Sequence, residues 1–205
     1  MPPASSETLA RELIATLKAA GFQAFLVGGC VRDLLLGRIP GDYDVSTDAT
    51  PDQVLQLFPK AQMVGAKFGV VLVARGTAAV EVATFRSDGV YTDGRHPEKV
   101  AFERAPDKDV QRRDFTINGM MMDPVSGDVI DLAGGQADLA ARTIRAIGDP
   151  KRRFEEDHLR MLRAVRFAAR LNFTIEAETF SAIRELRKEI QDISPERIRD
   201  ELVRI

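Results

Sequence analysis

The sequence predicts an α+β protein, with a small mixed sheet and helices over residues 1–147 and an all-helical domain over residues 148–205. Two observations support this division. Strand-like and helix-like segments alternate in the first part, whereas only helical patterns follow Pro150. The charge balance also changes, because residues 142–205 hold 15 Lys and Arg against 12 Asp and Glu, and residues 1–141 hold 14 against 19. A basic helical part is therefore expected to follow an acidic mixed part.

The first part consists of apolar runs separated by glycine and proline, as is typical of short strands between helices. Ser5 precedes a helical pattern that stops at Gly21, and Thr50 and Pro51 suit the N-cap and first turn of another helix. In chain order we expect a helix over 5–20, a strand over 22–29, a helix over 30–37, a strand over 43–47, a helix over 50–59 and a β-hairpin over 69–85.

The next segment, residues 86–112, is polar and contains Gly89, Gly94 and Pro97, so we expect a long mobile loop there. The remaining expected elements are a helix or strand over 112–122, a small hairpin over 123–135, and helices over 152–173, 178–190 and 194–205.

Composition narrows the class of protein. The chain has 205 residues, of which 44% are hydrophobic and 29% charged, as in ordinary soluble globular proteins. Cys30 is the only cysteine, which excludes an internal disulfide and a four-cysteine zinc site and suits a reducing cytoplasm. No apolar run approaches the ~20 residues of a membrane span, and no targeting segment is recognised. We expect a cytoplasmic protein without a membrane partner; its oligomeric state is left open.

The segment GDYDVSTD, residues 41–48, places Asp42 and Asp44 two positions apart in an expected strand, so both side chains point to the same side. Two adjacent carboxylates repel each other, and a divalent cation such as Mg²⁺ removes that repulsion. Solvated aspartates or an Asx-turn explain the pattern equally simply, and for this motif alone they are favoured.

Other residues support the prediction of a metal site. Glu81 carries a charge where the pattern of its strand predicts burial, and it would supply a third carboxylate to a pair of metal ions roughly 3.5–4 Å apart; a solvent-facing edge charge is the alternative. Gly28 and Gly29 end a strand just before a helix that carries Arg32, a pattern suited to phosphate binding as well as to a plain turn. Together these features favour a nucleoside triphosphate beside a metal pair.

Three segments resemble one known family. FLVGGCVRDLLLGRIPGDYDVSTDATPDQVLQLFP is similar to the signature of class II template-independent nucleotidyltransferases, the bacterial CCA-adding enzymes and poly(A) polymerases of the polymerase-beta superfamily. RRDFTINGM resembles their second motif, and EEDHLRMLRAVRFAARLNF resembles their nucleotide-selecting helix. The resemblance covers nearly all of residues 20–200 and implies a polymerase-beta-like head followed by a helical neck.

The resemblance also implies roles for individual residues. Asp42 and Asp44 match magnesium ligands, and Glu81 matches a third catalytic carboxylate in a two-metal mechanism. The residues that match nucleotide-binding positions are Gly29, Arg32, Arg113, Asp157, Arg160, Arg163 and Arg166, and the strand–helix turn adds Gly28 as an expected nucleotide-binding residue. Among these, Asp157 and Arg160 match the pair that reads the Watson–Crick edge of the incoming base.

The pattern of the last motif agrees with this interpretation. Asp157, Arg160 and Arg163 recur every three residues along one side of the expected helix, and an acceptor beside a guanidinium can pair with a base edge. An i,i+3 surface salt bridge is the plainer explanation. We expect the apolar residues to pack on the other side, namely Met161, Leu162, Val165, Ala168 and Ala169.

The resemblance implies attack of an RNA 3′-hydroxyl on the α-phosphate of ATP or CTP with release of pyrophosphate. The expected partners are ATP, CTP and the 3′ end of an RNA, with CCA addition to tRNA as the first choice. Polyadenylation, or addition of A or C alone, is the alternative within the family. A small-molecule nucleotidyltransferase and a non-catalytic nucleotide-binding module are the alternatives from other classes.

Overall fold

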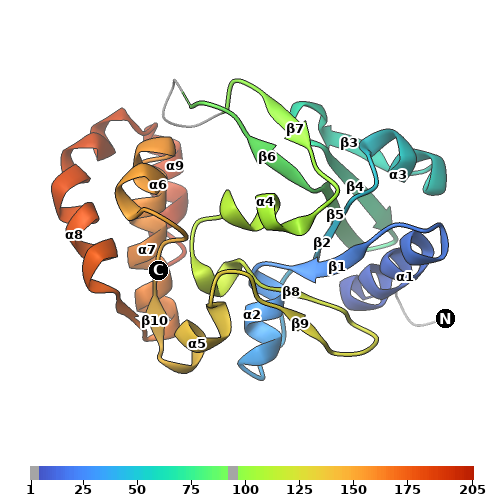
Figure 1. Ribbon diagram of the computed structural model, residues 1–205, viewed down its shortest axis with the longest axis horizontal. Helices are drawn as coiled ribbons and strands as arrows, with labels where there is room; N and C mark the ends of the chain where they lie inside the picture. The colour runs from blue at the N-terminus through green and yellow to red at the C-terminus, as the bar shows by residue number, and fades with distance from the viewer. Residues whose placement is uncertain (1–4, 92–96) are drawn as a thin grey trace.

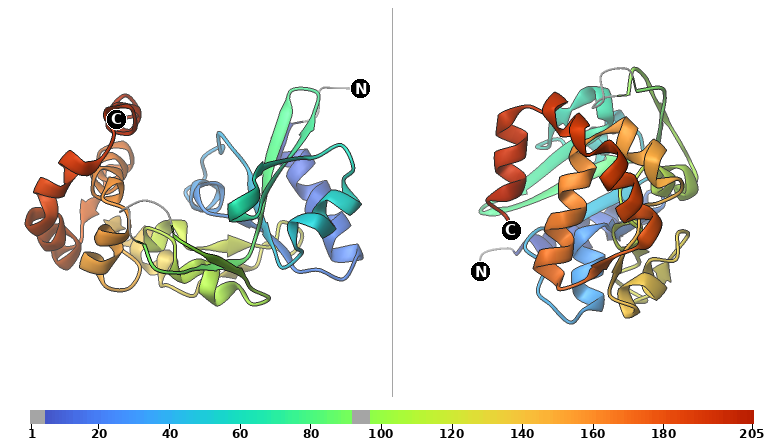
Figure 2. Two further views of the ribbon diagram at one scale, coloured as in Figure 1. Left: turned by 90° about the horizontal axis from the view of Figure 1, so that it is seen from above. Right: turned by 90° about the vertical axis from the view of Figure 1, so that its left-hand side faces the viewer.

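The computed structural model describes residues 5–91 and 97–205 and confirms the α+β class. The seven strands of the main sheet lie in the order β3–β4–β5–β2–β1–β8–β9, and β2 and β5 are its parallel pair. Their bounds are β1 Ala24–Val27, β2 Asp44–Thr47, β3 Gln62–Gly65, β4 Val70–Arg75, β5 Ala78–Thr84, β8 Met121–Met122 and β9 Val129–Ile130. Figures 1 and 2 show this sheet at one end of the molecule and the C-terminal helices at the other.

The helices are α1 Ser6–Ala19, α2 Gly29–Leu35, α3 Pro51–Leu57, α4 Pro106–Gln111, α5 Gly135–Ala140, α6 Pro150–Glu156, α7 Leu159–Leu171, α8 Ala177–Leu186 and α9 Pro195–Leu202. α1 covers one face of the sheet, where it packs against β1, β2 and β5. Ser5 caps it by accepting a hydrogen bond from the Thr8 N–H at 3.1 Å, and its buried side is apolar, with Leu9, Leu13 and Leu17. Because α1 fills that face, the opposite face of β2 is available for polar side chains.

The expected long loop over residues 86–112 is wrong for most of its length. Arg86–Asp88 and Val100–Phe102 form β6 and β7, an antiparallel pair, and α4 follows them. Gly94 lies outside the described residues. Polar side chains in this segment obscure its strands, because neither β6 nor β7 contributes a continuous apolar face to the core.

Two further expectations need correction. Residues 112–122 form a short 3₁₀ turn, Thr116–Asn118, followed by β8, and β8 pairs with β9 in the expected hairpin. A strand does occur after Pro150, because β11 (Thr174–Ile175) pairs in parallel with β10 (Thr143–Ile144). The division at residue 147 stays a prediction; apolar side chains from both sides of it, such as Phe115 and Phe167, share one cluster.

The described helices contain no segment with the length and apolar character needed to cross a lipid bilayer.

Candidate active site

Three carboxylates lie near the start of β2. Asp44 is its first residue and is paired in register with Glu81 of β5. The next pair, Val45 and Val82, is fully buried, so Asp44 and Glu81 project from the other face of the sheet. Asp42 is exposed and lies two residues before the strand. Two expectations are therefore corrected: β2 does not extend back to Asp42, and Glu81 is exposed where burial was expected.

The protein alone compensates the charge of Asp44 poorly. Burial and the charge of Glu81 raise the pKa of Asp44 to about 6, and Asp42 adds to this effect while Arg113 opposes it. In the part of the chain that the structure describes, no three His, Cys, Asp or Glu side chains converge on a common metal position. Asp42 and Asp44 line the same hollow and offer a pair of oxygen donors, a set that leaves other positions open to water and substrate and fits Mg²⁺.

The glycine pair lies directly under two guanidinium groups. Gly28, at the end of β1, has a φ of 76°, which glycine adopts readily, and α2 starts at Gly29. A Cβ atom on Gly28 would lie 3.4 Å from Nη1 of Arg113, and one on Gly29 would lie 3.6 Å from Nη2 of Arg32. The absence of both side chains therefore leaves the backbone of this turn open to a phosphate oxygen beside the two arginines.

Replacing Gly28 by alanine is expected to cost about 1–3 kcal/mol of stability through backbone strain and also to weaken nucleotide binding, because the new methyl group occupies space beside Arg113 that a phosphate oxygen would need. Urea unfolding and equilibrium binding of CTP measure the two effects. Gly37→Ala is the matched control, since Gly37 has a φ of 68° but no heavy atom within 4 Å of a built Cβ. Its stability is expected to fall while its affinity for CTP is unchanged. Equal affinities for the two variants would contradict the placement of Arg113 over the glycines.

Both arginines are held in position by polar neighbours. Arg113 donates to Asp109 at 2.8 and 3.2 Å and to the Ser46 hydroxyl of β2 at 3.3 Å. Arg32 is buried and donates to the side-chain oxygen of Asn118 at 2.8 Å. Asp109 is completely buried, and although burial opposes its ionisation, Arg113 and Arg112 hold its pKa below the ordinary value.

An ion pair between buried Asp114 and half-buried Arg163 joins the second motif to α7. Asp114 accepts hydrogen bonds from Arg163 at 2.8 Å, from the Asn118 amide at 3.1 Å and from the Phe115 N–H at 2.7 Å. Burial acts against the Asp114 charge, but Arg163 and these hydrogen bonds keep its pKa below the ordinary value. The same Asp114 raises the pKa of Arg163, so the guanidinium stays charged.

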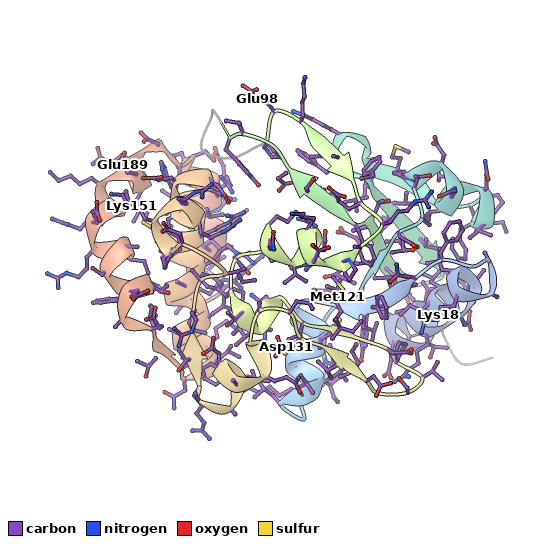
Figure 3. The ribbon with its side chains drawn as sticks, in the orientation of Figure 1. Lys18, Glu98, Met121, Asp131, Lys151 and Glu189 are labelled. Carbon is purple, nitrogen blue, oxygen red and sulfur yellow. The ribbon has the colours of Figure 1, made fainter. Side chains whose placement is uncertain are left out.

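Three guanidinium groups surround one aromatic ring. Arg32, Arg163 and Arg166 lie 5.2, 5.3 and 4.4 Å from the centre of the Phe167 ring. Arg166 is buried and is held by Glu201 of α9 at 2.6 Å. Figure 3 shows side chains of the helical end, marked by Lys151 and Glu189, and side chains of the sheet end reaching into the space between them.

The expected faces of the nucleotide-selecting helix are partly wrong. The helical pattern is interrupted, because α6 ends at Glu156 and Asp157 has an extended backbone with φ −152° and ψ 105° before α7 begins. Val165 and Ala169 are exposed, whereas Arg166 is buried by its ion pair. Met161 is buried and Leu162 and Ala168 are half-buried, as expected.

The two expected base-reading side chains do not pair with each other among the described contacts. Asp157 accepts from Arg197 of α9 at 2.8 Å and from the Leu159 N–H at 3.1 Å. Arg160 donates to Glu156 at 2.6 Å. The i,i+3 salt bridge considered as the plainer explanation is therefore not formed here.

These groups line one cleft of about 460 Å³, within the range of small-molecule sites. It contains all eight expected nucleotide-binding residues together with Asp44; the full lining is Gly28, Gly29, Arg32, Asp44, Arg112, Arg113, Asp114, Asn118, Asp157, Leu159, Arg160, Arg163, Arg166, Phe167 and Arg197. An adjoining hollow of about 520 Å³ shares Gly29, Arg32 and Asp44 with the cleft and also contains Asp42. Glu81 lines neither of the two hollows. Its connection to the site is its position opposite Asp44 on the neighbouring strand.

Sequence reasoning missed several residues of the cleft. Asp114 and Asn118 lie inside the RRDFTINGM motif. Their signal in the sequence was an acid and an amide close to two consecutive arginines. Phe167 sits between two arginines of α7 and was detectable only as an aromatic residue in a basic helix. Arg197 carried no signal, because it lies 40 residues from its partner.

Two family models and several curated relatives match this chain. A family model described as the poly A polymerase head domain matches residues 24–145, and one described as a probable RNA and SrmB-binding site of polymerase A matches residues 172–205. The CCA-adding enzyme of Lactobacillus helveticus (strain DPC 4571) is 46% identical over 196 residues, which cover 96% of this chain and 49% of that enzyme. That of Geobacillus sp. (strain WCH70) is 48% identical over 186 residues, covering 91% and 46%.

Solved structures give the same relationship. The crystal structure of the Bacillus stearothermophilus CCA-adding enzyme in complex with CTP superposes with a TM-score of 0.87 at 41% identity, covering 98% of this chain and 48% of that one. A tRNA nucleotidyltransferase complexed with a primer tRNA and an incoming ATP analog has a TM-score of 0.76 at 29% identity, covering 93% and 54%. The chain thus spans about half the length of the relatives it matches. The chain belongs to the poly(A) polymerase head-domain family of nucleotidyltransferases.

Proposed function

We propose that this chain carries the catalytic and nucleotide-selecting part of an enzyme that adds CMP and AMP to the 3′ end of tRNA. The supporting observation is that one cleft brings together Asp44, the Gly28–Gly29 turn and the pair Asp157 and Arg160. A carboxylate site, a phosphate site and a base-reading site are the three parts that template-independent transfer requires. The matching relatives are CCA-adding enzymes, which favours tRNA as the acceptor.

The triphosphate is proposed to lie over Gly28 and Gly29, where Arg32 and Arg113 neutralise its charge and fix its position. Asp42 and Asp44 would hold Mg²⁺ beside the α-phosphate, with Glu81 as the neighbouring carboxylate. Bound Mg²⁺ would lower the pKa of the acceptor hydroxyl and stabilise negative charge on the leaving pyrophosphate. The pre-positioned arginines act on charge that develops during transfer, so they are expected to contribute to the rate as well as to binding.

Selection of the base is proposed to rest on the polarity of two side chains. Asp157 only accepts hydrogen bonds and Arg160 only donates them. Cytosine and adenine both present an amino donor next to a ring-nitrogen acceptor, and this pattern complements the pair. Uracil and guanine present an oxygen acceptor next to an N–H donor, which places like groups opposite each other. The pair therefore selects C and A and rejects U and G.

Primer extension tests the function directly. A tRNA that ends at its discriminator base is incubated with the chain, Mg²⁺ and CTP, ATP or both. The proposal predicts two added nucleotides with CTP alone and three with CTP and ATP together. A long A tail would instead identify a poly(A) polymerase. Binding of CTP without any RNA product would favour a small-molecule transferase or a non-catalytic module.

A further inference from the structure

Asp157 and Arg160 carry opposite charges and lie three residues apart, a spacing at which opposite charges near a helix can form an ion pair. In the described structure each instead binds a different partner. Arg197 donates through Nη2 to Oδ2 of Asp157 at 2.8 Å, and Glu156 accepts from Nη1 of Arg160 at 2.6 Å. The carbonyl oxygen of Arg112 accepts from Nη2 of Arg160 at 3.2 Å. The acceptor and the donor of the proposed base-reading pair are thus held separately.

Arg197 is well placed to hold Asp157 away from Arg160. It is in the first turn of α9, lines the same cleft as Asp157 and Arg160, and its side chain is 22% exposed. α9 is also fixed to α7 through the buried pair between Glu201 and Arg166. The guanidinium therefore approaches Asp157 from a separate, anchored helix.

The extended backbone of Asp157 leaves its side chain to be oriented by hydrogen bonds. Because Asp157 lies between α6 and α7, its side-chain direction is not set by helical packing. One oxygen accepts from the Leu159 N–H, and the other accepts from Arg197. A carboxylate oxygen has two lone-pair positions, so a single bond to Arg197 orients the group and still leaves acceptor sites for a base. Arg160 lines the same cleft and follows Asp157 by three residues, so it is available to Asp157 when Arg197 is removed.

Building on the proposed function, we propose that Arg197 is a specificity-determining positioning residue, which keeps Asp157 from pairing with Arg160. Loss of Arg197 lets the two side chains satisfy each other. A self-paired acceptor and donor no longer complement the edge of cytosine or adenine. The preference for these bases over uracil and guanine then falls, although the phosphate site at Gly28, Arg32 and Arg113 is unchanged.

Equilibrium binding measures this preference without any RNA. Dissociation constants for CTP and UTP, each with Mg²⁺, are determined for the native chain, for Arg197→Gln and for Arg197→Lys. Arg197→Gln is expected to weaken CTP binding at least fivefold and to change UTP binding less than twofold. Arg197→Lys retains a cation for Asp157 and is expected to keep most of the native preference. An unchanged CTP to UTP ratio in Arg197→Gln, or an equal loss for both nucleotides, would overturn the assignment.

Arg199→Gln is the matched control. Arg199 lies in the same helix, is 68% exposed at its side chain and pairs with its neighbour Asp200. This variant is expected to bind both nucleotides like the native chain. If a thermal-unfolding test shows that Arg197→Gln does not fold, Glu156→Gln replaces it. This variant removes the carboxylate that holds Arg160, so it is also expected to reduce the preference for CTP over UTP.

A crystal structure of nucleotide-free Arg197→Gln separates this inference from the proposed function. The inference predicts an Asp157–Arg160 ion pair in that variant, whatever reaction the cleft performs. Asp157 remaining apart from Arg160 would refute the positioning role alone. A native chain that binds CTP and UTP equally would refute the proposed base selection. The presence or absence of the Asp157–Arg160 contact in the variant crystal would still show whether Arg197 keeps the two side chains apart.

Discussion

Asp44→Asn is expected to lower the rate of nucleotide incorporation by about a thousandfold or more, which corresponds to ~4 kcal/mol of transition-state stabilisation. The substitution keeps the size of the side chain but removes the charge that, with Asp42, is proposed to hold Mg²⁺. Single-turnover primer extension with saturating CTP measures the effect. Asp48→Asn is the matched control, because Asp48 follows the same strand but accepts hydrogen bonds from Gln23 outside the cleft. Native turnover by Asp44→Asn would remove the metal assignment.

The same variant, although slower in catalysis, is expected to make the metal-free protein more stable at neutral pH. The pKa of Asp44 is raised from 3.8 to about 6 in the folded chain, so the unfolded chain loses this proton at lower pH. The favourable contribution of the protonated group is complete below about pH 4 and is lost as the pH rises through about 6. At pH 7 in EDTA, Asp44→Asn is therefore expected to be more stable than the native chain by about 1–3 kcal/mol. Urea unfolding at pH 4 and pH 7 measures this, and a less stable variant at pH 7 would contradict it.

Asp114→Asn is expected to destabilise the folded chain by about 1–3 kcal/mol, because it removes the charged hydrogen bonds to Arg163, whose side chain is 33% exposed. Asparagine can still accept from the Phe115 N–H, but its amide cannot neutralise the guanidinium. Since α7 carries Arg163, nucleotide binding is expected to weaken as well. Urea denaturation at pH 7 measures the loss of stability, and CTP titration measures the loss of affinity.

The pH dependence of this effect has a defined sign. The pKa of Asp114 is below its ordinary value in the folded chain, so its stabilisation is present above the pKa of an unfolded aspartate and is lost as the pH falls through the folded value. The difference between Asp114→Asn and the native chain should therefore shrink in acid. Asp200→Asn, which removes one partner of an exposed pair on α9, is expected to change stability by less than about 0.5 kcal/mol. A similar result for Asp114→Asn would mean that its pair with Arg163 contributes little.

Much of the site was predictable because its chemistry is local in the sequence. Gly28, Gly29 and Arg32 occupy one strand–helix turn, and Asp42 and Asp44 occupy the next segment. Short spacing fixes which side chains lie together whatever the rest of the chain does. The resemblance to class II nucleotidyltransferases then related these segments to α7, and the cleft contains all the expected nucleotide-binding residues.

The remaining features depend on distant contacts. The break at Asp157 is stabilised by Arg197, and the burial of Arg166 requires Glu201, 35 residues away. A helical pattern cannot show either, because a charged residue on α7 looks solvent-facing until its partner is known. The strands β6 and β7 were missed for a related reason: their residues pair with each other and contribute little to the core from which strands are usually recognised.

The cleft lining contains seven arginines and three aspartates, although the chain as a whole has a net charge of −2. This uneven distribution of charge gives the cleft a positive electrostatic potential, although the protein as a whole is slightly acidic. Polyanions approaching from a distance are guided toward the opening and away from the remaining surface, and this long-range attraction weakens as ionic strength shortens the Debye length. Capture of substrate should accordingly be fast in dilute buffer and slow progressively with added salt, even where the bound complex itself is little changed.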